Sequence, residues 1–320
     1  MKKILFLGEC MVELRLSTSN ALSQSFAGDV YNSAVYLKRA FPNVHTSFVT
    51  AIGSDALSNN MQHTVTLEQI ETQMMFVHPD KAPGIYLIET DDEGERSFTY
   101  WRNDSAAKKV MDFIGEAEQA TLEKADMFMF SGISLAVIEE NSRDKFWTVL
   151  QSLKDAGVQI VFDPNYRPKL WDSPAKAKEQ FDKAFALSDI ALPGIEDFEV
   201  LYDLNSAEQV IKHCLSLGVS EIIVKNGPQS VFSFVDSKQE EHTIISVDNV
   251  VDTTSAGDAF NGAYLGSRLN DINIADSIKL GATAAGTVIQ HKGAIIPKQN
   301  FNHAMTEKMT ELNNKRQDNV

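Results

Sequence analysis

The sequence predicts an α/β protein in which helices cover both faces of a mostly parallel sheet. Short apolar runs alternate with longer helical patterns over most of the 320 residues, which is typical of repeated strand–helix units. Several runs are apolar almost throughout, as strands covered on both faces are. The expected strands are "KILFLG" (3–8), "SFVTAIG" (47–53), "MFMFSG" (127–132), "VQIVFD" (158–163), "DIALP" (189–193) and "EIIVKNG" (221–227).

Helical patterns lie between these strands, and one β segment breaks the alternation. "GIYLIETDDEGERSFTYWRN" (84–103) reads as two strands around the turn "DDEGE", with Gly94 in the loop. We expect this hairpin to protrude from the main sheet and to form a small β lid with the segment around 11–28. The exposed edge of the lid is a candidate dimer surface, although charge often only blunts such an edge. The expected helices cover 32–41, 136–156, 174–187 and 206–217.

Composition restricts the classes of function. Apolar residues make up 43% of the chain, enough for a large core, and we expect one domain over 1–320. The net charge of −15 argues against binding to nucleic acid or to an anionic membrane. The two cysteines, Cys10 and Cys214, are too few for a disulfide framework, and no apolar run is long enough to span a membrane. The start "MKKILFLGE" reads as a strand and not as a signal peptide, so the expected location is the cytoplasm.

The stretch "DTTSAGDAFNGAYL" (252–265) carries the strongest chemical signal. Ser255, Ala256 and Gly257 are small residues at the expected start of a helix, where unpaired amides and the positive end of the helix dipole attract anions. Asp258 then lies near both a bound phosphate and an incoming hydroxyl, whose proton a carboxylate can accept. Taken alone, the stretch is equally compatible with a capped helix packed through small residues.

The same stretch closely resembles the signature of the ribokinase-like sugar kinases, also called the phosphofructokinase-B family. The resemblance implies a three-layer α/β/α sandwich with a β lid, ATP as the phosphate donor and Mg²⁺ as its partner. It also implies that Asp258 is the catalytic base and that Ser255, Ala256 and Gly257 form an anion hole. Ser255 departs from the commonest family form, which has glycine there.

Other motifs extend the resemblance over nearly the whole chain. "FAGDVYNSAVYL" matches the first family motif and implies that Gly28, Asp29 and Asn32 contact the sugar, although Ala27 replaces the first glycine of the motif. "TAIGSDALS" (50–58) is similar to the segment after the second strand. "VKNGPQSVF" and "IQHKGAIIP" resemble the segments around the nucleotide. Together with Ser255 and Gly257, the residues implied there are Asn165, Lys225, Asn226, Gly227 and Gly293.

Three stretches resemble the family members that phosphorylate a sugar acid: "LGECMVEL" (7–14), "GERSFTYWRNDSAAK" (94–108) and "FDPNYRPKLW" (162–171). The implied substrate is 2-keto-3-deoxygluconate, phosphorylated on its terminal (6-) hydroxyl. A carboxylate substrate calls for arginine, whose planar fork binds it with paired hydrogen bonds. The candidates are Arg102 and Arg167, helped by Tyr86, Tyr100 and Asn165; on residue type alone, each arginine is equally a solvated charge and each tyrosine a packing residue.

Metal sites are the least distinct signal. The family's N-x-x-E element corresponds to "LPGIEDFEV" (192–200), with Gly194 in place of Asn and Asp197 in place of Glu. We therefore expect Mg²⁺ to be held mainly by nucleotide phosphates and water, with Asp197 in the outer shell. Asp252 and Thr254 resemble positions near a monovalent-cation (K⁺) loop, although Asp252 is equally able simply to orient Thr254.

Competing classes are separated by simple features. A dinucleotide-dependent oxidoreductase needs G-x-G-x-x-G after the first strand, but "ECMVEL" follows "KILFLG". A P-loop kinase needs G-K-[ST], which does not occur. Two alternatives stay open: another sugar kinase of the same family, such as a fructokinase, and a non-catalytic sugar-binding regulator on the same fold.

Overall fold

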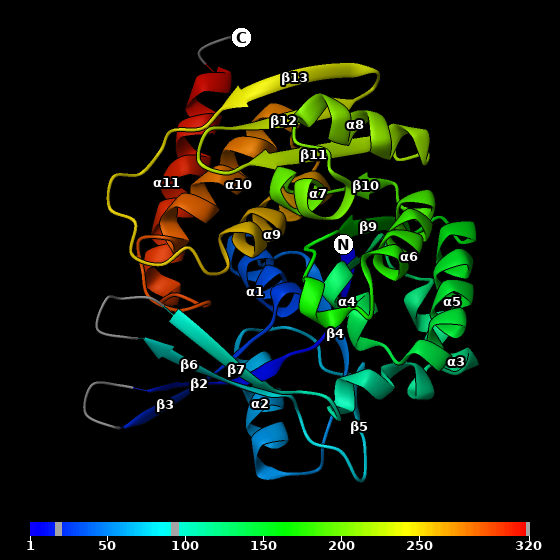
Figure 1. Cartoon of the computed structure of the whole chain (residues 1–320). Helices are drawn as coiled ribbons and strands as arrows, with labels where there is room; N and C mark the ends of the chain where they lie inside the picture. Colours follow the sequence, from blue (N-terminus) through cyan, green and yellow to red (C-terminus); the bar gives the residue numbers. More distant parts are fainter. Residues whose placement is uncertain (17–20, 91–95, 318–320) are drawn as a thin grey trace.

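The computed structural model describes residues 1–16, 21–90 and 96–317. Its main sheet is built from β1 (Lys3–Leu7), β4 (His45–Ile52), β5 (Met75–Val77), β8 (Met127–Ser131), β9 (Gln159–Asp163), β10 (Ile190–Ala191), β11 (Glu221–Asn226), β12 (Ser230–Val235) and β13 (Lys238–Thr243). Within the described residues their order is β13-β12-β11-β10-β9-β8-β1-β4-β5. The strands from β11 to β5 are parallel, while β12 and β13 are antiparallel at one edge (Figure 1). The predicted, mostly parallel sheet is confirmed.

Side chains of β1, an inner strand of the sheet, alternate between two hydrophobic cores, one on each face of the sheet. Ile4 and Phe6 of β1 belong to the first core, and Leu5 and Leu7 belong to the second. All four are buried, which explains why the strand reads as a continuous apolar run. The helices that contribute to the first core are α1 (Asp29–Ala40), α2 (Ala56–Leu67), α9 (Ala256–Leu269), α10 (Ile274–Val288) and α11 (Lys298–Gln317).

The second core is rich in aromatic rings. Phe162 of β9 lies with its ring centroid 5.0 Å from that of Phe130 and 5.4 Å from that of Phe181. The elements on this face are η1 (Ala106–Phe113), α3 (Glu116–Leu122), α4 (Gly132–Val137), α5 (Arg143–Asp155), α6 (Pro174–Leu187), α7 (Ile195–Tyr202) and α8 (Ala207–Ser216). The two helical layers and the sheet between them form the expected three-layer sandwich (Figure 1).

Small residues bring α1 and α9 into close contact. A Cβ atom at Gly262 would lie 2.4 Å from the carbonyl oxygen of Ser33, and one at Gly266 would lie 2.3 Å from the ring of Phe41. Only glycine permits this approach. The two helices run side by side from a common end, so their first turns meet at one edge of the sheet.

The lid is a separate four-stranded sheet, in which β2 (Met11–Leu16), β3 (Leu22–Ala27), β6 (Ile85–Thr90) and β7 (Arg96–Trp101) are ordered β3-β2-β6-β7. Strands β2 and β6 pair in parallel and join two antiparallel hairpins. The sheet protrudes from the main body beside α1 (Figure 1). The predicted lid is confirmed; the turn around Gly94 lies outside the described residues.

Several elements differ from the expectation. The helix expected over 136–156 is divided into α4 and α5, with a 3₁₀ turn, η2 (Glu140–Ser142), between them. The Arg143 side chain caps the last turn of α4: its guanidinium donates to the carbonyl oxygens of Leu135 and Ala136 at 3.1 and 3.5 Å. Helices α2, α3, α7, α10 and α11, strand β5 and the β12–β13 hairpin were not predicted.

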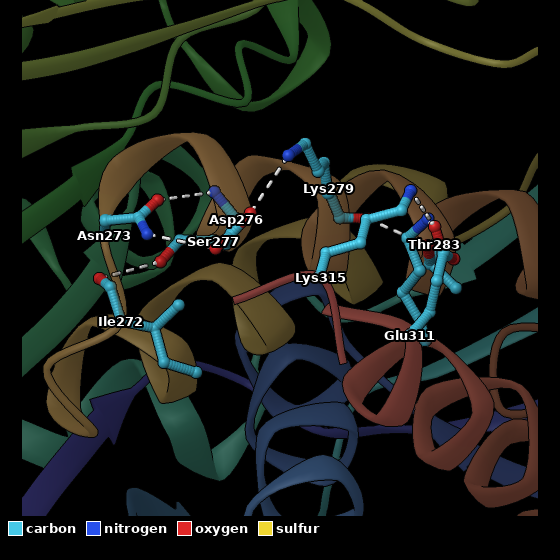
Figure 2. A network of polar contacts seen from close by, with 9 residues as sticks. Ile272, Asn273, Asp276, Ser277, Lys279, Thr283, Glu311 and Lys315 are labelled. Carbon is cyan, nitrogen blue, oxygen red and sulfur yellow. Dashed lines mark hydrogen bonds and ion pairs between the residues drawn. The ribbon is translucent and has the colours of Figure 1, made fainter. Parts of the chain in front are cut away.

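Polar contacts fix the ends of the C-terminal helices (Figure 2). Asn273 caps α10: its Oδ1 accepts a hydrogen bond from the Asp276 amide at 2.9 Å, and its Nδ2 donates to the side-chain carboxylate of Asp276 at 3.0 Å. Lys279 adds an ion pair of 3.0 Å to Asp276. Among the described residues, no helix has the length and apolar character that a membrane crossing requires.

Candidate active site

The first turn of α9 carries Asp258 at the edge of the sheet where α1 also begins. Ser255 is the N-cap residue, with φ 65° and ψ 10°, and its side chain does not cap the helix. The amide of Ala256 donates to the carbonyl oxygen of Thr253 at 3.3 Å, so one of the four expected donors already has a partner. Gly257 adds no side chain over the turn. The stretch therefore forms an uncapped helix start of small residues, as the sequence predicted.

Asn32 connects this turn to the first motif. Its Nδ2 donates to Asp258 Oδ2 at 2.8 Å, and its Oδ1 accepts the amide of Gly28 at 3.3 Å. Gly28 precedes α1, and a Cβ there would lie 2.0 Å from the carbonyl oxygen of Glu9. The structure thus brings Gly28, Asn32 and Asp258 together from distant parts of the chain.

The environment of Asp258 suits acid–base chemistry. Burial, and after it the nearby carboxylate of Asp29, raise the pKa of Asp258 to about 7, and the hydrogen bond from Asn32 opposes this shift. A carboxylate with a pKa near neutrality accepts a proton efficiently at physiological pH. Asp29 itself is held by Asn165, whose Nδ2 donates to its Oδ2 at 3.0 Å.

Lys225, at the end of β11, contacts a buried carboxylate. Its Nζ lies 3.3 Å from Asp163 Oδ2 and 3.2 Å from Asn261 Oδ1, and Asn261 Nδ2 donates to the same Asp163 oxygen at 2.6 Å. A Cβ at Gly257 would lie 3.8 Å from Lys225 Nζ, so the ammonium group lies against the first turn of α9. The other oxygen of Asp163, Oδ1, is buried without a hydrogen-bond partner.

A second carboxylate lies at the start of α7. Asp197 Oδ1 accepts the amide of Tyr166 at 3.0 Å and lies 3.9 Å from Arg167 Nη1. Burial, and after it the carboxylate of Asp163, raise the pKa of Asp197 to about 6, and Lys225 and Arg167 oppose this shift. The Arg167 side chain is 56% exposed, so its guanidinium is available at the surface of the site.

No cluster of three or more His, Cys, Asp and Glu side chains within the described residues has the geometry to hold a metal ion. The charge of Asp163 raises the pKa of both Asp197 and Asp258, but the three carboxylates do not form a metal-binding cluster. A Mg²⁺ ion held chiefly by phosphate oxygens and water fits this arrangement, and the free Oδ1 of Asp163 offers it one carboxylate oxygen.

The lid contributes tyrosines and an arginine. Tyr86 and Tyr100 face each other across β6 and β7 with ring centroids 5.7 Å apart, and Tyr100 is half exposed. The hydroxyl of Tyr86 donates to Glu13 Oε2. Arg102 does not stand alone, because its Nη2 donates to Glu9 Oε2 in a buried ion pair.

The loop before α9 is ordered by Asp252. Its Oδ1 accepts the amide of Thr254 at 2.9 Å and its Oδ2 accepts that of Gly293 at 3.0 Å. Gly293 has φ 92°, a left-handed conformation that favours glycine. Arg15 of β2 reaches the same carboxylate, with its Nη2 4.0 Å from Asp252 Oδ2.

The remaining predicted nucleotide residues lie in the turn between β11 and β12. Asn226 donates to Gln229 and Ser230 at 3.2 and 3.4 Å, and Gly227 has φ 54°. Sequence reasoning missed Glu9, Asp163, Asn261 and Arg15. Three of them stood in the motifs already noted, Glu9 in "LGECMVEL", Asp163 in "FDPNYRPKLW" and Asn261 in "DTTSAGDAFNGAYL", but nothing in one sequence marks which of these side chains pair with one another.

A three-layer sandwich with a β lid, and an aspartate beside an uncapped helix start and a lysine, define a phosphotransferase that acts on small carbohydrates. Residues 1–300 match the model of the pfkB family carbohydrate kinases, and the chain belongs to this family.

Relatives with assigned activities match over nearly the whole length. The 2-dehydro-3-deoxygluconokinase of Haemophilus influenzae is 38% identical over 312 residues, covering 96% of this chain and 99% of that one. The 2-dehydro-3-deoxygluconokinase of Escherichia coli K12 is 36% identical over 310 residues, covering 93% and 98%. A fructokinase of Vibrio alginolyticus is more distant, with 28% identity over 265 residues and 83% of both chains covered.

Solved structures share the fold. The fructokinase of Xylella fastidiosa with bound ATP superimposes with a TM-score of 0.82 at 20% identity, covering 97% of this chain and 99% of that one. The 2-dehydro-3-deoxygluconokinase of Thermotoga maritima superimposes with a TM-score of 0.80 at 18% identity, covering 96% and 100%. At these identities the likeness confirms the ribokinase-like fold.

Proposed function

We propose that the protein transfers the γ-phosphate of ATP to the terminal (6-) hydroxyl of 2-keto-3-deoxygluconate, also named 2-dehydro-3-deoxygluconate, giving the 6-phosphate. The assigned activity of the Haemophilus and Escherichia relatives supports this substrate. The observation that carries the proposal is Asp258, whose pKa of about 7 and contact with Asn32 suit a base at the start of α9.

In the proposed transfer, side chains and amides of this chain accept the proton and stabilise the charge on the phosphoryl group. Asp258 accepts the proton of the terminal hydroxyl, whose oxygen forms the new bond to the γ-phosphorus as the bond to the β-phosphate oxygen breaks and ADP leaves. The backbone amides of Ser255, Gly257 and Asp258, together with Lys225, stabilise negative charge on the phosphoryl oxygens. Closure of the lid excludes water, which otherwise competes for the phosphoryl group.

The sugar acid lies, in this proposal, between the lid and the first turns of α1 and α9. Gly28, Asp29 and Asn32 contact its hydroxyls. Its anionic end is bound by guanidinium groups, because a carboxylate matches their paired N–H donors. The residues proposed for that end are Tyr86, Tyr100, Arg102, Asn165 and Arg167.

The nucleotide lies on the other side of Asp258, against the ends of β9 and β11. A bound Mg²⁺ would supply positive charge that offsets the negative charge developing on the phosphate oxygens. We propose that the free Oδ1 of Asp163 would contact this ion and that Asp197 would lie in its outer shell. The residues proposed for the nucleotide are Asn165, Lys225, Asn226, Gly227, Ser255, Gly257 and Gly293.

A monovalent cation beside Asp252 and Thr254 belongs to the same proposal, and K⁺ is the candidate. Asp252 is 5% exposed, and a cation beside it would stabilise the loop that leads into the anion hole. Replacing KCl by tetramethylammonium chloride at constant ionic strength tests this role. Unchanged activity would remove the cation from the proposal.

The quaternary and cellular parts of the proposal are a single kinase unit over 1–320, a dimer formed through the exposed edge of the lid, and a cytoplasmic location. Trp101 exposes 57% of its surface on β7, an edge strand of the lid, which supports an interface there. A monomer in analytical ultracentrifugation at micromolar concentration would exclude the dimer.

The experiment that tests the function is a coupled ADP-release assay over ribose, fructose, gluconate and 2-keto-3-deoxygluconate. We expect the highest kcat/KM for the keto acid. In parallel, Arg102→Ala should raise KM for the acid far more than for a neutral sugar. Preference for fructose would favour the fructokinase alternative, and no ADP release with any sugar would favour the non-catalytic regulator.

A further inference from the structure

The four lid strands meet the body of the protein in one row of residues. The strand pairing places Met11 opposite Ala27 and Ile85 opposite Trp101, with Val12 opposite Ile85 between the two hairpins. Each strand enters or leaves the lid at this row, which we call the lid root. The chain passes between the body and the lid four times at this root, and we call these segments the first to fourth connections. A residue that contacts all four therefore influences the position of the lid relative to the body.

Glu9 is that group. It follows β1 and precedes β2, so it belongs to the first connection, and its carbonyl oxygen lies against Gly28 of the second. At the third connection, a Cβ on Gly84 would lie 2.7 Å from Glu9 Oε1 and 3.1 Å from Arg102 Cβ. At the fourth, Glu9 Oε2 accepts a hydrogen bond from Arg102 Nη2.

The Glu9–Arg102 pair is shielded from water. The Glu9 side chain is 1% exposed and that of Arg102 is 11% exposed. A buried ion pair stabilises the fold only when hydrogen bonds satisfy the remaining polar atoms of both side chains. Glu9 Oε1, however, has no hydrogen-bond partner. With one buried acceptor unsatisfied, the Glu9–Arg102 pair contributes little to the stability of the fold. This favours a role for the pair in binding.

We propose that Glu9 is a positioning residue that fixes the guanidinium of Arg102 at the lid root and so sets the affinity for the carboxylate of the sugar acid. This inference rests on the proposed function. Glu9 engages Nη2, whereas an arginine carries five N–H donors, so other donors stay available to a substrate carboxylate in a fixed orientation. Glu9 contacts no reacting atom and acts through Arg102.

The test is a double-mutant cycle on the full chain, read as KM and kcat for 2-keto-3-deoxygluconate. Glu9→Gln keeps the shape of the side chain but removes the charge that roughly doubles the strength of the hydrogen bond to arginine. We expect KM for the acid to rise about tenfold, with kcat and KM for ATP within about twofold, because only orientation of the acid is lost. In an Arg102→Ala background, Glu9→Gln should cause no further rise in KM.

Two further variants separate positioning from stability. Glu9→Asp keeps the charge but withdraws the carboxylate by one methylene, and it should also raise KM for the acid. Glu68→Gln is the matched control, because Glu68 forms a buried pair with Arg39 at 2.6 Å, far from the lid root. It should lower the melting temperature without changing either KM.

The outcomes divide cleanly. An unchanged or lowered KM in Glu9→Gln, or the same factor in both backgrounds, overturns the positioning role, as does failure of both Glu9 variants to fold. Failure of the wild-type protein to phosphorylate 2-keto-3-deoxygluconate contradicts the proposed function instead, before any variant is compared.

Discussion

Asn32 Nδ2 donates to Asp258 Oδ2 at 2.8 Å, across 226 positions of the chain. The bond joins the first turn of α1 to the first turn of α9. It depends on Gly262, which lets the two helices approach closely enough for the side chains to meet. The sugar motif and the phosphate motif thereby become one site.

Asp258→Asn should lower kcat by about three orders of magnitude or more while changing KM little, because the amide cannot accept the hydroxyl proton.

The same variant should be more stable than the wild type at pH 8. The folded-state pKa of about 7 lies above the ordinary aspartate value of 3.8, so the folded protein binds the proton more tightly than the unfolded chain does. Stability contributed by this group is therefore full below about pH 4 and declines as pH rises to about 7. Melting curves at pH 5 and pH 8 check this; retained turnover would exclude Asp258 as the base.

Asp29→Asn should move the rise of kcat with pH to lower pH. In the wild type we expect kcat to rise through about pH 7 as Asp258 ionises, and the charge of Asp29 helps to hold the pKa of Asp258 there. Asn32→Ala is the opposed variant, because loss of its hydrogen bond to Asp258 should move the rise to higher pH. Shifts in the same direction for both variants would contradict this account of the pKa.

Lys225→Met should raise KM for ATP and lower the free energy of unfolding by on the order of 3 kcal/mol, since it leaves the buried carboxylate of Asp163 without its ion pair. Urea unfolding measures the second effect. Adding Asp163→Asn should recover part of the stability but not the affinity for ATP. An unchanged KM for ATP would place the phosphates away from Lys225.

Ser255→Gly should raise stability slightly. The φ of 65° is a left-handed conformation that disfavours a side chain by about 1 kcal/mol, and the greater freedom of glycine in the unfolded chain offsets part of the gain. Ser255→Ala is the control, because it keeps the strained conformation and removes only the hydroxyl. A larger gain from alanine than from glycine would assign the strain to the hydroxyl instead.

Local signals accounted for the fold class and for the centre of the site. Continuous apolar runs identified the strands because each lies between two helical layers, and the hairpin signal around 84–103 identified the lid. Small residues followed by Asp258 marked the helix start, because that chemistry is contained within one short stretch. The division of 136–156 into α4 and α5 escaped prediction, since it depends on a guanidinium reaching back to carbonyl groups of the preceding helix.

The order of residues along the chain already shows which groups are present: a carboxylate at a helix start, the two arginines and two tyrosines that we propose for a sugar acid, and a lysine at a strand end. Only the tertiary structure decided their partners. It paired Arg102 with Glu9, left Arg167 exposed, and set Lys225 against Asp163. The physical reason is that the charge available at a site depends on neighbours brought in from other elements, and burial magnifies each such contact.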